Sequence, residues 1–358
     1  MRRTIFLGMI CGVCTLLIGA SVWFFFFRQE QKTIFVPRAG EFAPFHTATV
    51  SPALRVDGSG TNIDAVAFWE APTPEEATLF VSGKGNDVIE QWRYPFSGVE
   101  LPPLHLAWRP NGLRVDHVGK KLLVGNSEDA TVEIFSLPDL VHTQTIGREI
   151  IASGETDVDV LYRDDGTAWI FATEDDAVRA FDGASGEQRL HFMPDVDSIE
   201  EIVVDGFHRA IYVPEESGIA SKKHPRGAVL TYDFDGMPKT INGRTAFGTD
   251  GVFSGDEEGI ALYACPADGT ADDGRGFLIV VDQAGADTSF EFFDRTTWAH
   301  LGTLTIAGVT GTDGIAITQK PLPNFPRGIF AVTDNNKSVA LVDMEMILEK
   351  TGLWCSGA

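Results

Sequence analysis

Residues 157–182 read DVDVLYRDDGTAWIFATEDDAVRAFD, and the order of residue types in this stretch decides the fold. An acid precedes an apolar run, and the turn residues Asp164-Asp165-Gly166 follow. A second β-rich run comes next, and the unit ends at Phe181-Asp182. β-Branched and aromatic residues favour strands, and Asp-Gly pairs accept the positive φ angles of tight hairpin turns. The stretch therefore predicts short antiparallel strands joined by hairpins.

Units of the same order recur along the chain. They open at Asp64, near Asn111, and at Asp157, Glu200, Glu258 and Asp313, at intervals of 43 to 58 residues. A propeller blade of four short strands needs roughly 40–50 residues, whereas a β-sandwich has no such repeat and a parallel β-helix repeats at about half this length or less. We therefore predict an all-β, six-bladed β-propeller over residues 61–358, with one closing helix at Met344–Lys350.

The N-terminal segment has a different composition. Residues Ile5 to Phe27 contain no charge, and 23 residues are enough to span a bilayer as a helix. A cleavable signal peptide ending at Ile18-Gly19-Ala20 is the alternative, but the apolar run continues past this site. We predict a cytoplasmic tip and transmembrane signal anchor at residues 1–28, with Arg2 and Arg3 on the cytoplasmic side. The rest of the chain is then periplasmic or extracellular, beginning with a proline-containing linker at residues 29–60.

Charge and cysteine content restrict the function further. The chain has 51 acidic and 28 basic residues and a net charge of −23. Such a field repels nucleic-acid backbones and favours hard cations, so we expect no nucleic-acid partner. Two cysteines lie outside the apolar segment, Cys265 and Cys355, and they either pair or stay as separate buried thiols.

The repeat predicts where acids meet. Equivalent residues of successive blades lie at the same radius and height, so the acids that open the units should form a ring near the central channel. This ring would contain Asp64, Asp157, Glu200, Glu258 and Asp313. Further acids end the second strands: Glu174, Glu215-Glu216, Asp282 and Asp334. Converging carboxylates favour Ca²⁺, which takes six to eight oxygen ligands; the alternative is that each acid caps a turn separately.

Several stretches resemble one family. The residues Asp256-Glu257-Glu258-Gly259-Ile260-Ala261-Leu262-Tyr263 and Gly274-Arg275-Gly276-Phe277-Leu278-Ile279 are similar to the fifth blade of β-propeller phytases. Thr312-Asp313-Gly314-Ile315 and Phe325–Val332 resemble the sixth blade, and Ile199–Glu216 resembles the fourth. The resemblance covers residues 62–353 and is strongest over the C-terminal half.

The resemblance implies an activity and a set of site residues. Phytases of this family hold Ca²⁺ ions at the top of the channel and hydrolyse phosphomonoesters with metal-activated water. The positions similar to their acidic ligands are Asp64, Glu200, Glu215, Glu216, Glu258 and Asp313. Lys84 is similar to the phosphate-contacting lysine, although a solvated turn lysine is the alternative. We therefore expect Lys84, Glu200 and Glu258 to be catalytic, with a phosphorylated small molecule as substrate.

The chain also departs from the family pattern. Asp116 stands where the family has a phosphate-binding arginine, and Asp157 and Glu174 stand where it has a tyrosine and a second lysine. These changes replace attraction for phosphate by repulsion. Two hypotheses follow: a Ca²⁺-dependent phosphomonoesterase acting on a substrate less charged than phytate, or a non-catalytic calcium-binding propeller that binds a protein or glycan outside the cell. The basic run Lys222–Arg226 is expected to be an exposed loop.

Overall fold

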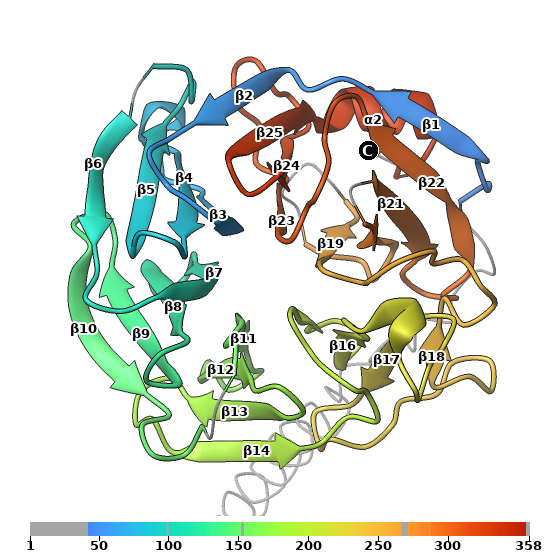
Figure 1. The fold of residues 1–358 in the computed structure, drawn as a ribbon, viewed down its shortest axis with the longest axis horizontal. Coiled ribbons are helices and arrows are strands. Elements are labelled where there is room, and N and C mark those ends of the chain that lie inside the picture. Colours follow the sequence, from blue (N-terminus) through green and yellow to red (C-terminus); the bar gives the residue numbers. More distant parts are fainter. Residues whose placement is uncertain (1–41, 99, 152–153, 267–270, 286, 356–358) are drawn as a thin grey trace, which may run out of the picture. The chain divides into compact units, whose positions relative to one another are not determined.

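The chain folds into a ring of six β-sheets around a central axis (Figure 1). The computed structural model describes residues 42–355 apart from 99, 152–153, 267–270 and 286. Residues 40–358 form one compact unit. The prediction of an all-β, six-bladed propeller is confirmed.

The first four blades each contain four antiparallel strands in chain order. Blade 1 contains β3 (Ile63–Trp69), β4 (Thr78–Gly83), β5 (Val88–Arg93) and β6 (Glu100–His105), and blade 2 contains β7 (Pro110–Asp116), β8 (Lys121–Asn126), β9 (Thr131–Ser136) and β10 (Val141–Ile146). Blade 3 contains β11 (Val158–Tyr162), β12 (Ala168–Thr173), β13 (Val178–Asp182) and β14 (Gln188–Phe192), and blade 4 contains β15 (Val203–Asp205), β16 (Ala210–Pro214), β17 (Val229–Tyr232) and β18 (Ala246–Phe247). The first strand of each blade is the inner one, and we call the side of the ring on which the inner strands begin the upper face.

The last two blades each receive a strand from the start of the propeller. Blade 5 contains β19 (Ile260–Ala264), β20 (Gly276–Ala284), β21 (Asp287–Asp294) and β22 (His300–Ile306), and blade 6 contains β23 (Ile315–Thr318), β24 (Ile329–Asp334) and β25 (Ser338–Asp343). Strand β1 (Thr47–Val50) adds to β22 in parallel, and β2 (Leu54–Asp57) pairs with β25 antiparallel, as the fourth strand of blade 6. The ring is therefore closed by hydrogen bonds between its two ends.

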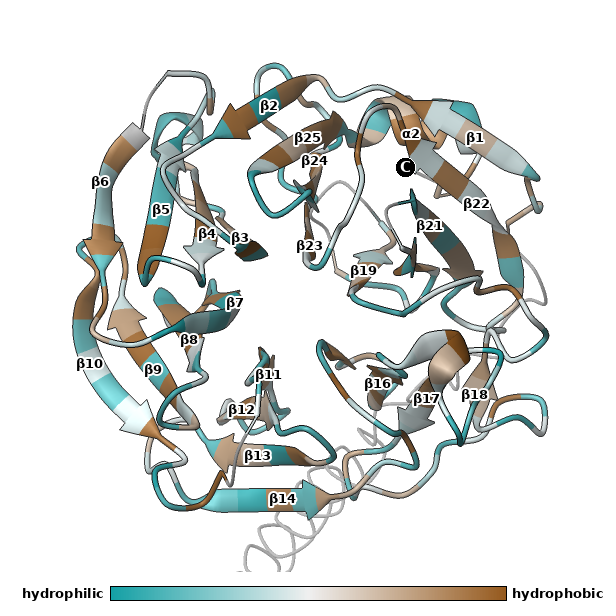
Figure 2. Cartoon of the chain, viewed as in Figure 1, coloured by the Kyte–Doolittle hydropathy of each residue, from teal (hydrophilic) through white to brown (hydrophobic). Residues whose placement is uncertain are grey.

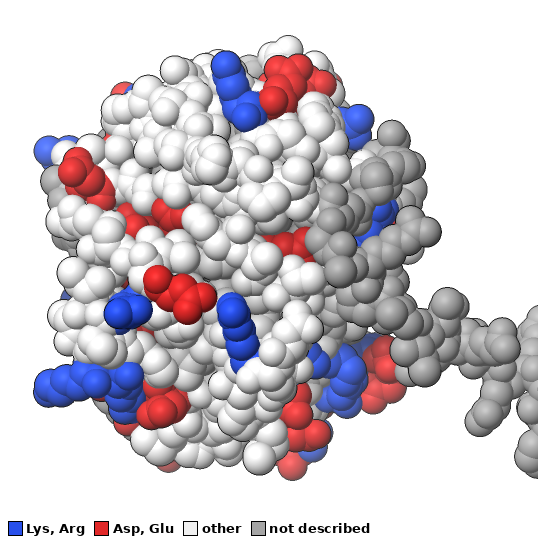
Figure 3. Space-filling model, turned by 90° about the vertical axis from the view of Figure 1, so that its right-hand side faces the viewer, with Lys and Arg blue, Asp and Glu red and all other residues white. Residues whose placement is uncertain are grey.

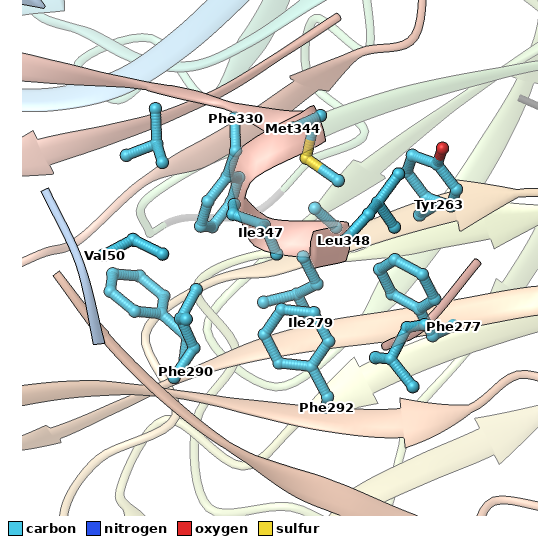
Figure 4. Close-up of a cluster of buried hydrophobic side chains, with 14 of the residues drawn as sticks. Val50, Tyr263, Phe277, Ile279, Phe290, Phe292, Phe330, Met344, Ile347 and Leu348 are labelled. Atoms are coloured by element: carbon cyan, nitrogen blue, oxygen red, sulfur yellow. The ribbon is translucent and has the colours of Figure 1, made fainter. Parts of the chain in front are cut away.

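Apolar residues fill the spaces between neighbouring blades. Six clusters of buried side chains occur, one for each pair of adjacent blades, and apolar and polar residues alternate along many of the strands (Figure 2). The cluster between blades 5 and 6 includes Phe277, Phe292 and Phe330 and is covered by helix α2 (Met344–Thr351) through Ile347 and Leu348 (Figure 4). Because each sheet is covered on its faces by its neighbours, the inner strands are held in fixed positions around the axis.

Helix α2 has defined ends and is tied to blade 5. The side chain of Asp343 accepts a hydrogen bond from the Glu345 backbone N–H, and Gly352 ends the helix with a φ of 73°. Cys355, which follows the helix, forms a disulfide with Cys265 at a Cα–Cα distance of 5.8 Å. Of the two alternatives for these cysteines, the structure shows the pair. Two single-turn 3₁₀ helices complete the described elements, at Pro74–Glu76 and Gly218–Ala220.

The boundary of the propeller differs from the prediction. Residues 29–60 were expected to form a linker, but β1 and β2 lie inside this range and belong to blades 5 and 6. The strands are only four residues long and are separated by Pro52, so their sequence resembles an irregular segment. Val50 and Val56 are nevertheless buried. The predicted membrane anchor, residues 1–28, lies outside the described residues, and none of the described helices is long and apolar enough to cross a membrane.

Candidate functional site

The beginnings of all six inner strands meet at one cavity on the axis. Its lining includes one residue from each blade opening: Asp64, Asn111, Asp157, Glu200, Glu258 and Asp313. Glycines allow the strands to approach closely here, because a Cβ at Gly314 would lie 2.2 Å from the Asp64 carbonyl oxygen and a Cβ at Gly112 would lie 2.1 Å from Asp157 Oδ1. The repeat in the sequence therefore becomes a narrow, acidic channel.

Six carboxylates gather at the upper end of this channel, and we call them the mouth cluster. They are Asp64, Glu155, Glu200, Glu216, Glu258 and Asp313, from blade 1 and from blades 3 to 6. Oxygens of Asp64, Glu155 and Glu200 lie within 4.8 Å of one another. The Gln283 side chain donates a hydrogen bond of 3.2 Å to Glu258 Oε1. The arrangement places several carboxylates within reach of a single cation.

One buried positive charge enters the cluster, and a half-exposed one lies at its edge, where Arg109 Nη2 is 3.9 Å from Glu155 Oε1. The Lys84 ammonium donates a hydrogen bond of 2.7 Å to Asp64 Oδ1 and a second one to Glu155 Oε2. The Lys84 side chain is only 6% exposed. Burial alone would lower the pKa of Lys84, but the carboxylates of Asp64 and Glu155 outweigh burial and raise the pKa above its ordinary value. The side chain is therefore charged.

One ammonium does not neutralise the cluster. Burial, a hydrogen bond with the Glu258 side chain and the charge of Asp64 raise the pKa of Glu200 well above its ordinary value. Burial and the charges of Asp64 and Glu258 raise the pKa of Asp313 to about 7. Burial and Glu258 likewise raise the pKa of Glu216. The cluster thus holds protons near neutral pH unless a cation replaces them.

Deeper acids of the channel hold the blades together. Asp157 Oδ2 accepts a hydrogen bond of 3.0 Å from the Ile202 backbone N–H, and Asp159 Oδ2 accepts one of 2.7 Å from the Val204 N–H. Both bonds join blade 3 to blade 4. Glu201 Oε2 joins blade 4 to blade 5 in the same way, through the Ile260 N–H at 2.8 Å. These acids therefore have a structural role that the sequence did not indicate.

Arg114 lies among these deeper acids. Its Nε is 3.0 Å from Asp159 Oδ1, and its charge also acts on Asp157 and Glu201. The Arg114 charge therefore balances carboxylates below the mouth cluster.

The pKa of Asp157 gives a testable pH dependence. Burial raises this pKa to about 7, although Arg114 and the Ile202 N–H act in the opposite direction. Between pH 4 and 7 the unfolded chain loses the Asp157 proton while the folded chain keeps it, so the contribution of Asp157 to stability is full below pH 4 and is lost as the pH rises through 7. In chelator, the unfolding free energy should fall by up to about 2.7 kcal/mol less between pH 5 and pH 7 in Asp157→Asn than in the unsubstituted protein. The variant keeps the contact between blades, because its amide oxygen can still accept the hydrogen bond from the Ile202 N–H. Urea unfolding at pH 5 and at pH 7 measures this difference in unfolding free energy.

The matched control for this measurement is Asp235→Asn. Asp235 is an exposed turn residue and its substitution makes the same change of charge. The control should keep the pH slope of the unsubstituted protein. Equal slopes for Asp157→Asn and the control would contradict the assignment of this titration to Asp157.

Other predicted acids serve loops. Glu215 is fully buried and accepts hydrogen bonds from the Asp197 and Ser198 N–H groups and from the Ser221 hydroxyl, so the structure does not place it in the mouth cluster with Glu216. Three other acids that end second strands have local partners: Glu174 pairs with Arg179, Asp282 with Ser254 and Asp334 with Arg55. Asp116, which stands at the family's arginine position, accepts hydrogen bonds from the Tyr162 hydroxyl and the Gly119 N–H. These acids therefore have separate local roles and do not contribute to the mouth cluster.

Sequence reasoning missed Glu155. This residue is half exposed and lies two positions before Asp157, just as Asp256 lies two positions before Glu258. The sequence feature that could have identified Glu155 is therefore a second acid ahead of a blade opening. In blade 3 the earlier acid reaches the mouth cluster and the later one, Asp157, points into the channel below it.

The residues at the mouth fit a hard cation. Besides the carboxylates, the cavity is lined by Asn111, which is 1% exposed and whose Oδ1 has no hydrogen-bond partner among the described residues. A buried amide oxygen without a partner is costly, and it is also a ligand that Ca²⁺ accepts. The side chains at the mouth that could act as metal ligands all offer oxygen atoms, which Ca²⁺ and Mg²⁺ prefer.

No protein-family model matches the chain, and no curated protein matches it.

The described basic residues of the surface do not form a second candidate site. The basic run Lys222–Arg226 is part of an exposed loop that is bound to the preceding segment, through the Lys222 N–H to Asp197 and His224 Nε2 to the Asp195 carbonyl. On the side of the molecule in Figure 3, basic and acidic side chains are interspersed and form no large basic patch.

Proposed function

We propose that this protein is a divalent-cation-dependent phosphomonoester hydrolase of phytase-like type, with Ca²⁺ as the cation. The observation that carries the proposal is the mouth cluster: six carboxylates from five blades, with one lysine and one unpartnered buried amide oxygen. So much negative charge in one place is stable only if protons or cations share it. Converging oxygen ligands favour a hard cation.

The residues that would hold cations are Asp64, Glu155, Glu200, Glu216, Glu258 and Asp313. A bound cation would neutralise phosphate charge and lower the pKa of a coordinated water. The side chains supply the remaining chemistry. Glu200 and Glu258 are hydrogen bonded to each other, and this pair can accept a proton from water and return it to a leaving group. Lys84 offers an ammonium to a phosphate oxygen at the same place.

We propose a substrate less charged than phytate. Among the described residues, no arginine or lysine lines the channel cavity, and two bases approach the mouth cluster: Lys84, which is hydrogen bonded to Asp64, and Arg109, whose Nη2 lies 3.9 Å from Glu155 Oε1. Arg114, two residues before the position of the family's phosphate-binding arginine, is paired with Asp159. Six carboxylates thus face two bases, which disfavours a substrate with many phosphates.

Phosphate release tests the proposal. Residues 40–358 would be assayed with p-nitrophenyl phosphate and with phytate, in millimolar Ca²⁺ and in chelator. We expect Ca²⁺-dependent release that is faster from p-nitrophenyl phosphate, and we expect Glu258→Gln to lower kcat at least about a hundredfold, the usual contribution of a general acid or base. An exposed acid, Glu349, provides the control Glu349→Gln. Absence of turnover with both substrates would exclude the hydrolase.

A second function is favoured by the same charge pattern. Acids stand at positions where a phosphate-binding enzyme needs bases. One of them, Asp116, accepts hydrogen bonds from the Gly119 N–H and the Tyr162 hydroxyl. The alternative proposal is a calcium-binding propeller without catalysis that binds a protein or glycan. Ca²⁺ binding without turnover would support this second function.

We also propose that residues 1–28 anchor the protein in a membrane, with the propeller on the periplasmic or extracellular side. Two observations support this location: the 23 uncharged residues from Ile5 to Phe27, and the disulfide between Cys265 and Cys355, which suits an oxidising compartment.

A further inference from the structure

The Lys84 ammonium occupies a position that a metal ion would need. Oxygens of Asp64, Glu155 and Glu200 lie within 4.8 Å of one another, and Lys84 Nζ is hydrogen bonded to two of these three side chains. Asp64 is 7% exposed and Lys84 is equally buried. The ammonium is therefore an internal cation of this site and not a solvated turn residue.

The backbone at Lys84 is fixed, and its ammonium reaches a half-exposed partner. The Lys84 N–H donates to the Asn62 carbonyl at 3.0 Å, and the Gly85 N–H donates to the Thr61 carbonyl at 2.8 Å. A Cβ at Gly85 would lie 2.5 Å from the Thr61 hydroxyl, so this turn is tightly packed. Glu155, the second partner of the ammonium, is 43% exposed. The ammonium therefore bridges the buried Asp64 and the open side of the mouth.

We propose that Lys84 is the counter-ion of the cation-free site, and that a divalent cation displaces its ammonium from Asp64 and Glu155 and so frees it to contact an anionic phosphate. This inference rests on the proposed function, because it assumes that the mouth cluster binds a cation. It adds that cation binding and phosphate binding are coupled through one side chain.

The coupling follows from charge and from ligand count. A divalent cation and an ammonium repel each other, and both draw on the carboxylates of Asp64 and Glu155. Ca²⁺ takes six to eight oxygen ligands, so it competes with the lysine for these two carboxylates. Once displaced, the ammonium lies beside a site that has gained positive charge, and an anion bound there satisfies both cations.

Cation titrations of the full-length protein test the displacement. Terbium luminescence, with Ca²⁺ competition, would be compared between the unsubstituted protein, Lys84→Met, Lys84→Arg and the control Lys350→Met, which removes an exposed helix lysine. We expect Lys84→Met to bind the cation about tenfold more tightly, because no ammonium has to be displaced. Lys84→Arg should bind it severalfold more weakly, since a guanidinium holds carboxylates with two parallel hydrogen bonds. The control should be unchanged.

A second titration measures the released ammonium. With Ca²⁺ at saturation, inorganic phosphate should bind the unsubstituted protein and should bind Lys84→Met at least about tenfold more weakly. Tighter cation binding together with weaker phosphate binding is a pattern that a merely structural lysine would not produce.

The results separate the failure of this inference from the failure of the proposed function. Equal cation affinity in the unsubstituted protein and Lys84→Met would overturn the displacement while leaving the cation site in place. Cation binding by none of the proteins would overturn both. If Lys84→Met does not fold, Lys84→Arg decides the matter, because an unchanged cation affinity in that variant contradicts competition for the carboxylates.

Discussion

Saturating Ca²⁺ is expected to raise the unfolding temperature of residues 40–358 by about 5 °C, and the double variant Glu200→Gln, Glu258→Gln is expected to lose this rise. A ligand that binds only the folded state at a hundredfold excess over Kd adds about 2.7 kcal/mol of stability. For a domain of this size, 1 kcal/mol corresponds to about 2 °C. Glu200 and Glu258 are hydrogen bonded to each other within the mouth cluster, so replacing both removes its centre.

The same variant should behave differently in chelator. Without a cation, Glu200 is held at a raised pKa by burial and by its neighbours, so removing two half-buried acids relieves repulsion. We therefore expect the double variant to be at least as stable as the unsubstituted protein in chelator, although it gains nothing from Ca²⁺.

Calorimetry with and without Ca²⁺ measures both effects. The control is the double variant Glu75→Gln, Glu349→Gln, which makes the same change of net charge at two exposed positions outside the cavity. The control should keep the full rise. A rise of equal size in both double variants would place the stabilising ion elsewhere in the protein.

A chain that begins at Gly58 is expected to lose cooperative folding, whereas a chain that begins at Phe42 is expected to keep it. The longer chain retains β1 and β2, and the shorter one leaves β22 and β25 without their outer partners. Phe42, Val50 and Val56 are buried in the propeller, and each such side chain contributes about 1.5–3 kcal/mol. This loss, together with two broken ladders, is comparable to the whole stability of a typical domain, about 5–15 kcal/mol.

Urea unfolding followed by circular dichroism and by tryptophan fluorescence measures the effect of this deletion. The shorter chain should unfold over a broad range with different midpoints for the two signals, and the exposed edge of β25 should promote aggregation. Coincident, sharp transitions in the shorter chain would show that closure by β2 is not needed for a stable ring.

The fold was largely predictable because it is repetitive. Strands such as β12 and β25 can be located from the sequence, since their cores are continuous apolar runs between turn residues. The outer strands were not predicted. Strand β10, for example, is mostly exposed and has no apolar run, so its position is decided by pairing with β9. Strands β1 and β2 were missed because their partners are more than 250 residues away in the chain.

The site was predictable only where it follows the repeat. Asp64, Glu200, Glu258 and Asp313 open blades, and symmetry brings them to one cavity. The contacts of each carboxylate depend on differences of a few ångströms in side-chain position, and these cannot be read from the spacing of residues in the sequence. Glu215 and Glu216 illustrate the difference, because these adjacent acids divide between a loop and the mouth cluster.

The closure of the ring has a consequence for synthesis on the ribosome. Strand β2 is among the first parts of the propeller to be made, but Leu54 pairs with Leu341, which is among the last. At about 5–20 residues per second, β2 waits roughly 15–60 seconds for its partner. During this time the five earlier blades are completed one after another, and the growing ring stays open at one side with its apolar surface exposed. The contact that seals the finished protein therefore makes its nascent chain dependent on protection until translation is nearly over.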